Sequence, residues 1–234
     1  IGSGSIQISY FYGGALYFSH NLLLGALRVN EMMDQLMEQA RNPVELLDEY
    51  ISCELDDFHL LDRMDEPVTT VVGLGATSGY LRRLCKVDQP ELPVSPAAFQ
   101  AMLEELAARR PLELTTKQGV PGDLADLLLP AAMILKRYVS APGVHQLYLA
   151  DTDLCDSLLL EESAEKGLFK PSAAQEEDIL SAAWYTAKRF KIDEAHTSKV
   201  IDHSMELFDV LSRSYQSMPR ERLYLQVAGI LHDS

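Results

Sequence analysis

The chain has 234 residues, a net charge of −15 at pH 7, and 47 % hydrophobic and 24 % charged residues. This composition is ordinary for a soluble globular protein of one or two domains. No apolar run approaches the roughly 20 residues that span a bilayer, and three distant cysteines form no disulfide framework, so we expect a cytoplasmic protein with no membrane partner. The net negative charge argues against nucleic acid as a partner. Small phosphorylated ligands are compatible with it, because backbone N–H groups can hold them.

A loop of small residues opens the chain and leads into a hairpin. The loop comprises Gly2, Ser3, Gly4 and Ser5. Alternating runs over 6–12 and 15–21 follow, separated by Gly13 and Gly14, and this pattern predicts two antiparallel strands. The apolar run 22–24 predicts a third short strand.

Apolar periodicity, glycines and prolines predict the elements that follow the hairpin. In chain order they are a helix over 29–37, a helix over 44–55, a strand over 68–72, a helix over 79–85, a helix over 97–108 with Ser95 as its N-cap, a helix over 122–138 interrupted by Pro130, a strand over 144–149 and a helix over 153–160. Because residues 68–72 are nearly all β-branched, that strand is expected to be buried on both faces.

Everything after the acidic and small residues of 161–176 has helical periodicity. The expected helices cover 176–190, 194–214 and 220–232. We place a domain boundary in the linker, which gives a first domain over 1–165 and a second domain over 172–234. The predicted fold class is therefore α/β, followed by an all-helical segment.

Two glycine-rich turns are candidate phosphate sites. In the opening loop, the glycines let backbone N–H groups approach a ligand closely, and the serine hydroxyls add donors. The strand over 68–72 runs into the second turn, whose candidate residues are Gly73, Gly75, Ala76 and Thr77. The plainer interpretations stay open: a tight turn into the hairpin for the first, and packing glycines with Thr77 as an N-cap for the second.

Three side chains near the end of the chain are candidate metal ligands: His196, His232 and Asp233. Imidazole nitrogens and a carboxylate from neighbouring helices can ligate a divalent ion. His203 follows His196 by two helical turns and would share its face. The plainer interpretation of each histidine is a packing or surface residue.

Several motifs follow one another in order: Ile1–Gln7, Asn21–Arg28, Gly73–Thr77, Leu127–Leu135, Asp151–Leu160, Ala195–Val200, Leu207-Phe208 and Leu231–Asp233. Their order and spacing resemble the second half of the exopolyphosphatase and guanosine pentaphosphate phosphohydrolase family. The resemblance covers nearly the whole chain. It implies the second lobe of an actin-like, ribonuclease-H-type fold with a mixed sheet and flanking helices, followed by part of an HD-like helical domain.

The resemblance also implies an activity: release of orthophosphate, with Mg²⁺, from inorganic polyphosphate termini or from guanosine pentaphosphate. In this family, water attacks the terminal phosphorus in a cleft between two lobes. The glutamate that acts on this water, and an aspartate on the metal side, are expected before Ile1. We therefore expect no catalytic residue in this chain and predict that it is inactive alone. Homodimers are common in the family, so a second copy is one candidate partner, although the sequence carries no interface signature.

The chain departs from the family pattern at three positions. Ser3 and Ala76 stand where the family has glycines, and Leu124 stands where an arginine is expected. Alanine tolerates positive φ poorly, so the second turn is expected to bind phosphate differently. Three alternatives stay open: a non-catalytic sensor of guanosine tetra- or pentaphosphate, an ATP-binding kinase of the actin-like fold, and a phosphohydrolase that works through its own HD-type metal.

Overall fold

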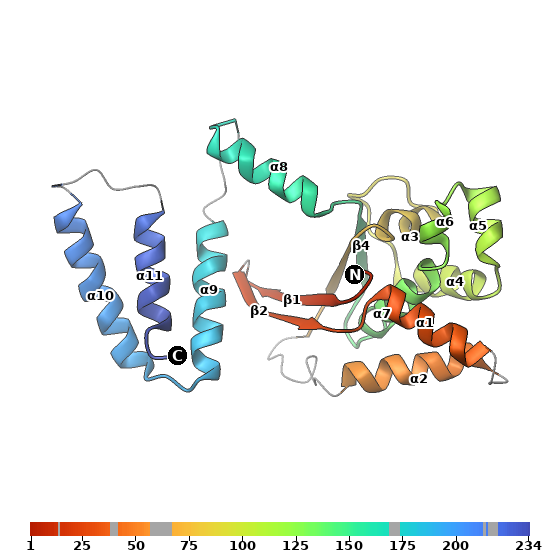
Figure 1. Ribbon diagram of the computed structural model, residues 1–234, viewed down its shortest axis with the longest axis horizontal. Coiled ribbons are helices and arrows are strands. Elements are labelled where there is room, and N and C mark those ends of the chain that lie inside the picture. The colour runs from red at the N-terminus through yellow and green to blue at the C-terminus, as the bar shows by residue number, and fades with distance from the viewer. Residues whose placement is uncertain (14, 38–41, 57–66, 169–173, 213, 215–219) are drawn as a thin grey trace. The chain divides into compact units, whose positions relative to one another are not determined.

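Strands and helices follow one another along the chain as Figure 1 shows. The computed structural model describes residues 1–13, 15–37, 42–56, 67–168, 174–212, 214 and 220–234. The strands are β1 (Ile6–Tyr12), β2 (Ala15–Leu22), β3 (Thr70–Leu74) and β4 (Gln146–Ala150). The helices are α1 (Ala26–Met37), α2 (Pro43–Asp56), α3 (Ser78–Leu84), α4 (Pro96–Ala107), α5 (Pro111–Gln118), α6 (Gly122–Ala125), α7 (Leu128–Val139), α8 (Leu154–Glu165), α9 (Ala174–Arg189), α10 (Glu194–Leu211) and α11 (Glu221–Leu231).

The contacts divide the chain into two compact units. Unit 1 comprises residues 1–6 and 21–162, and unit 2 comprises residues 7–20 and 163–234. The hairpin tip therefore groups with the C-terminal helices, whereas the division predicted from the sequence keeps it with the first domain. That predicted boundary stays a prediction. None of the helices in the described ranges is long and apolar enough to cross a membrane.

The sheet of unit 1 is a parallel pair, β3 and β4. Their register runs from Thr70 opposite Gln146 to Leu74 opposite Ala150. An isolated antiparallel bridge joins Val94 to β4. Since parallel strands end at the same edge of a sheet, the turn after β3 and the residue after β4 lie together. This edge carries the first candidate site.

One face of β3 is open, so the prediction of a strand buried on both faces is wrong. Val72 and Leu74 are 58 % and 49 % exposed. Successive side chains of a strand point to opposite faces. The face that carries Gly73 is covered by Leu135 of α7 and Leu149 of β4, whereas Val72 and Leu74 on the opposite face are exposed.

The predicted helices of unit 1 are confirmed, with three differences. Residues 22–24 end β2 and lead into α1 and form no third strand, because Gly25 turns the chain directly into the helix. The helix predicted over 122–138 is divided after Ala125 and not at Pro130. Pro130 lies in the first turn of α7, where its missing N–H would have no helical partner. Helix α5 was not predicted, since it buries only Leu114.

Unit 2 contains the three predicted C-terminal helices. Ala183 and Ala187 of α9 and Ile230 of α11 form its buried core. The hairpin contacts α9: the Leu16 amide donates a hydrogen bond to Asp178 Oδ1 at 3.0 Å, and the Phe18 ring lies 5.7 Å from that of Tyr185. These contacts, the first of which joins residues 162 positions apart, explain why the hairpin tip groups with the C-terminal helices.

Candidate functional site

The structure brings the two predicted phosphate loops together in unit 1. The Ile1 nitrogen donates a hydrogen bond to the Leu74 carbonyl at 2.6 Å. Gly75 has a φ of +124°, which only glycine adopts readily, and a Cβ there would lie 2.6 Å from the Ile1 carbonyl oxygen. The start of the chain and the turn after β3 are therefore in direct backbone contact. This contact joins residues that are more than 70 positions apart.

The opening loop lies on the first turn of α1. The Ala26 and Leu27 amides donate to the Gly2 and Ser3 carbonyls, both at 3.0 Å. A Cβ on Gly25 would overlap the backbone of Ser3, so only glycine allows this approach. The helix start thus fixes the position of two loop carbonyls.

The direction of these carbonyls also fixes the loop amides. In a trans peptide the N–H of one residue points opposite to the C=O of the residue before it. Since the Gly2 and Ser3 carbonyls point toward α1, the Ser3 and Gly4 N–H groups point away from it. Both residues are exposed, and neither amide has a hydrogen-bond partner among the described residues. Two adjacent N–H groups are therefore presented to solvent, which suits an anion.

The second turn is less open than the first. Ala76 is exposed, but Thr77 is buried, and although Thr77 occupies the N-cap position of α3, its side chain makes no capping hydrogen bond. Gly73 lies within β3, where a Cβ would be 2.8 Å from Leu149 Cδ2. Packing therefore accounts for glycine at 73, and the turn at Gly75 and Ala76 is the part that lies beside the opening loop.

Two charged residues at this edge were not predicted from the sequence as site residues. Asp151 directly follows β4, and its Oδ2 accepts a hydrogen bond from Arg82 Nη2 at 2.9 Å. Arg82 Nη1 donates to the Leu149 carbonyl at 2.8 Å, while Arg82 Nε is buried without a partner. The Asp151 carboxylate occupies the space that a side chain at Gly79 would need. Asp151 could have been predicted from its position: it directly follows an apolar strand, as Gly75 directly follows β3.

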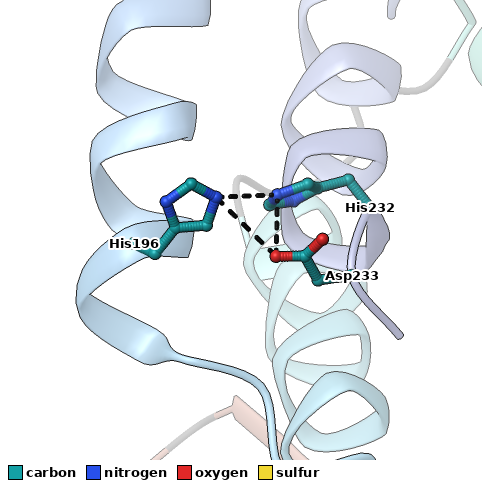
Figure 2. A group of neighbouring side chains, drawn as sticks. All are labelled: His196, His232 and Asp233. Atoms are coloured by element: carbon teal, nitrogen blue, oxygen red, sulfur yellow. Dashed lines mark hydrogen bonds and ion pairs between the residues drawn. The ribbon is translucent and has the colours of Figure 1, made fainter.

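The predicted metal ligands also meet, within unit 2 (Figure 2). His196 lies in the first turn of α10, and His232 and Asp233 follow α11. His232 Nε2 is 3.4 Å from His196 Nε2 and 3.2 Å from Asp233 Oδ2, and His196 Nε2 is 3.7 Å from Asp233 Oδ2. His203 is not part of this group: its side chain is 76 % exposed and lies 3.8 Å from Glu206.

Local interactions hold the two helix ends in place. Asp193 caps α10 by accepting hydrogen bonds from the Ala195 and His196 amides, at 2.9 and 3.1 Å. The bonds from His196 and then Ala195 lower the pKa of the Asp193 carboxyl. Gly229 allows α11 to approach α10 closely, because a Cβ there would be 3.1 Å from Ile201 Cγ1.

Comparison with known proteins gives structural matches alone. No family model and no curated protein matches the sequence. Two solved structures of Ppx/GppA proteins from Aquifex aeolicus match: a type II variant of the phosphatase (TM-score 0.54, 19 % identity, 69 % of this chain and 54 % of that chain) and a family member (TM-score 0.58, 18 % identity, 73 % and 56 %). A structure of an exopolyphosphatase-like protein matches with a TM-score of 0.55, 14 % identity, and 72 % and 58 % coverage.

The chain has the fold of the Ppx/GppA phosphatases. This likeness confirms the resemblance predicted from the sequence at the level of the fold, and it confirms a mixed α/β class. The chain spans a little over half the length of these Ppx/GppA structures, 54–56 % of them.

Proposed function

We propose that the chain is part of a phosphohydrolase that releases orthophosphate from polyphosphate termini or guanosine pentaphosphate. The observation that carries the proposal is the opening loop, whose Ser3 and Gly4 amides face away from α1 with no partner among the described residues. The contact between Ile1 and Gly75 supports it, since it brings the second glycine-rich turn beside the start of the opening loop. The fold shared with Ppx/GppA phosphatases points the same way.

In this proposal the chain binds and orients the terminal phosphate. The Ser3 and Gly4 N–H groups, with the hydroxyls of Ser3 and Ser5, donate hydrogen bonds to phosphate oxygens. These donors are held by α1 before the substrate arrives, so they stabilise negative charge on the phosphoryl group without reorganising. Water attacks the phosphorus in line with the leaving oxygen, and catalysis rests on positioning and electrostatics. The group that takes the proton from water is assigned to a first lobe outside this chain, so the chain alone is expected to be inactive.

The resemblance implies Mg²⁺, and the donors at this edge do not form a site for it by themselves. Mg²⁺ prefers several oxygen ligands in octahedral geometry, usually carboxylates, water and substrate phosphate. The carboxylate described here, Asp151, already pairs with Arg82. We therefore propose that carboxylates outside this chain, together with the substrate phosphates, would hold Mg²⁺, which would supply positive charge to the phosphoryl group.

The finer architecture is part of the same proposal. Unit 1 corresponds to the second lobe of an actin-like fold, and α9 to α11 correspond to the beginning of an HD-like domain. A cytoplasmic location and a homodimer belong to the proposal as well. They follow from the resemblance and await direct tests of location and oligomeric state.

A guanosine-phosphate sensor is the second candidate. The observation that favours it is the pairing of Asp151 with Arg82, which engages the carboxylate that directly follows β4. Such an edge binds phosphate without activating water. Absence of turnover with intact binding would support this function.

The test is orthophosphate release with Mg²⁺, on long-chain polyphosphate and separately on guanosine pentaphosphate. The full product of the reading frame is compared with the present chain. Release by the full product alone supports the proposal. The ratio of its rates on polyphosphate and on guanosine pentaphosphate identifies the preferred substrate. Release by the present chain contradicts the assignment of the proton acceptor to another lobe. No release by either protein, with guanosine-phosphate binding retained, supports the sensor.

A further inference from the structure

A small cavity lies between α3, α4 and α5 of unit 1 and opens to solvent on one side. Its volume is about 130 Å³. The apolar part of its lining includes Met102 and Leu106 of α4 and Leu114 of α5, and all three side chains are buried. An apolar cavity of about 150 Å³ is large enough to bind benzene. This cavity therefore has room for an apolar group of about the size of a small ring.

The rest of the lining is rich in positive charge. Arg83, Lys86 and Arg109 line the cavity with one carboxylate, Glu105, which gives these residues a net charge of +2 although the chain carries −15. Arg109 pairs with Glu105, and the Arg83 guanidinium lies over the Tyr80 ring, 4.4 Å from its centroid. Neither Arg83 nor Lys86 pairs with a carboxylate in the part of the chain that the structure describes. Two cations beside an apolar cavity are thus available to an anion.

The backbone at Lys86 gives no reason for a lysine. Helix α3 ends in a Schellman motif, in which the Val87 amide donates to the Arg82 carbonyl at 3.2 Å and the Lys86 amide donates to the Arg83 carbonyl at 2.9 Å. Lys86 has a φ of +61°, and glycine is the usual residue at this position of the motif. A side chain in this conformation costs stability. The cavity that Lys86 lines provides a role for its side chain that glycine could not fill.

We propose that this cavity binds a small organic carboxylate. The apolar group of the ligand contacts Met102, Leu106 and Leu114, and its carboxylate meets Arg83 and Lys86 at the open side. A guanidinium presents its donors in a planar fork that matches the two oxygens of a carboxylate. Ligand sites in proteins commonly combine an apolar lining with a few charged groups in this way. None of the lining residues belongs to the opening loop or to the turn after β3, so this proposal is independent of the proposed phosphohydrolase function.

The test titrates para-fluorobenzoate into the present chain and follows binding by fluorine NMR. Changes in the amide chemical shifts of the protein locate the site. Two reference compounds separate the contributions: para-fluorobenzyl alcohol lacks the charge, and acetate lacks the ring. We expect each of them to bind at least about tenfold more weakly, since one loses the charge-assisted hydrogen bonds and the other loses the apolar contacts.

Three variants test the role of Lys86. Lys86→Gln should weaken binding of para-fluorobenzoate about tenfold. Lys191→Gln is the matched control, because Lys191 follows α9 with a similar φ of +58° and does not line the cavity, and its affinity should stay within about twofold. Lys86→Gly should also weaken binding but raise the thermal midpoint, because glycine adopts the left-handed conformation freely. Weaker binding by a more stable protein cannot result from unfolding.

Saturable binding with shifts confined to α3, α4 and α5, weakened in both Lys86 variants and retained in Lys191→Gln, supports the proposal. Four outcomes would overturn it: no saturable binding, equal binding of the neutral alcohol, shifts centred on the opening loop, or unchanged affinity in Lys86→Gln. Circular dichroism checks that each variant is folded.

Discussion

Gly25 and Ser3 are in contact through their backbones, and this contact sets the direction of the opening loop. A Cβ at residue 25 would overlap the Ser3 carbonyl, which accepts a hydrogen bond from the Leu27 amide at 3.0 Å. The missing side chain therefore determines that the Ser3 and Gly4 amides face away from α1. The residue that shapes the loop lies 22 positions after it in the sequence.

Replacing Gly25 should displace the loop. We expect Gly25→Ala to destabilise the protein by about 1–3 kcal/mol, because backbone atoms cannot yield easily to the added methyl group. Loss of the aligned amides should lower phosphate release by the full reading-frame product about 100-fold. Gly122→Ala is the matched control, since a Cβ there meets nothing within 4 Å and the residue lies outside the opening loop. Equal effects of the two substitutions on stability and release would contradict this account.

Asp151 should matter to stability although it lies on an exposed edge. Asp151→Ala leaves the buried Arg82 guanidinium with the Leu149 carbonyl as its described partner, and Nε already has none. We expect a loss of about 1–3 kcal/mol in the free energy of unfolding, below the range for a fully buried pair because Asp151 is half exposed. Urea unfolding measures it. Lys117→Ala breaks an exposed pair and should change stability much less.

The cap of α10 should make stability depend on pH. Hydrogen bonds lower the folded pKa of Asp193, so its contribution is fully present above the unfolded pKa of about 3.9 and is lost as the pH falls through the folded value. Asp193→Asn keeps a capping oxygen but has no charge to titrate. We expect its thermal midpoint to be lower than that of the original chain at neutral pH and to approach it near pH 2. A constant difference across this range would argue against a role for the charge.

The three thiols should differ in reactivity. Burial raises the pKa of Cys85 to about 11, whereas Cys53 and Cys155 are exposed. Because the thiolate is the reactive form, Cys85 should be alkylated more slowly than the other two at pH 8. Mass spectrometry after timed iodoacetamide treatment measures the three rates. Raising the pH toward 11 should speed the reaction of Cys85, and unfolding the chain should make the three rates similar.

Local signals predicted most elements of the fold but not their exposure. The Ser95–Pro96 pair correctly marked the start of α4, and the Ser95 side chain accepts from the Ala98 amide as an N-cap should. The β-branched strand was taken to be buried on both faces, but Val72 is exposed because α7 covers only the other side of β3. Composition indicates that a segment is a strand, and the packing of distant helices decides which faces are covered.

For the candidate sites too, the sequence determined some features and the tertiary structure decided others. By itself the sequence determined which residues carry the chemistry: the small residues of the opening loop and the adjacent His232 and Asp233. Only the tertiary structure decided which residues meet: Ser3 with Gly25, Asp151 with Arg82, and His196 with His232. The physical reason is the separation along the chain over which each kind of interaction acts. Propensities and caps act over a few residues, whereas contacts between distant segments depend on which surfaces pack together and on where a missing Cβ lets two backbones touch.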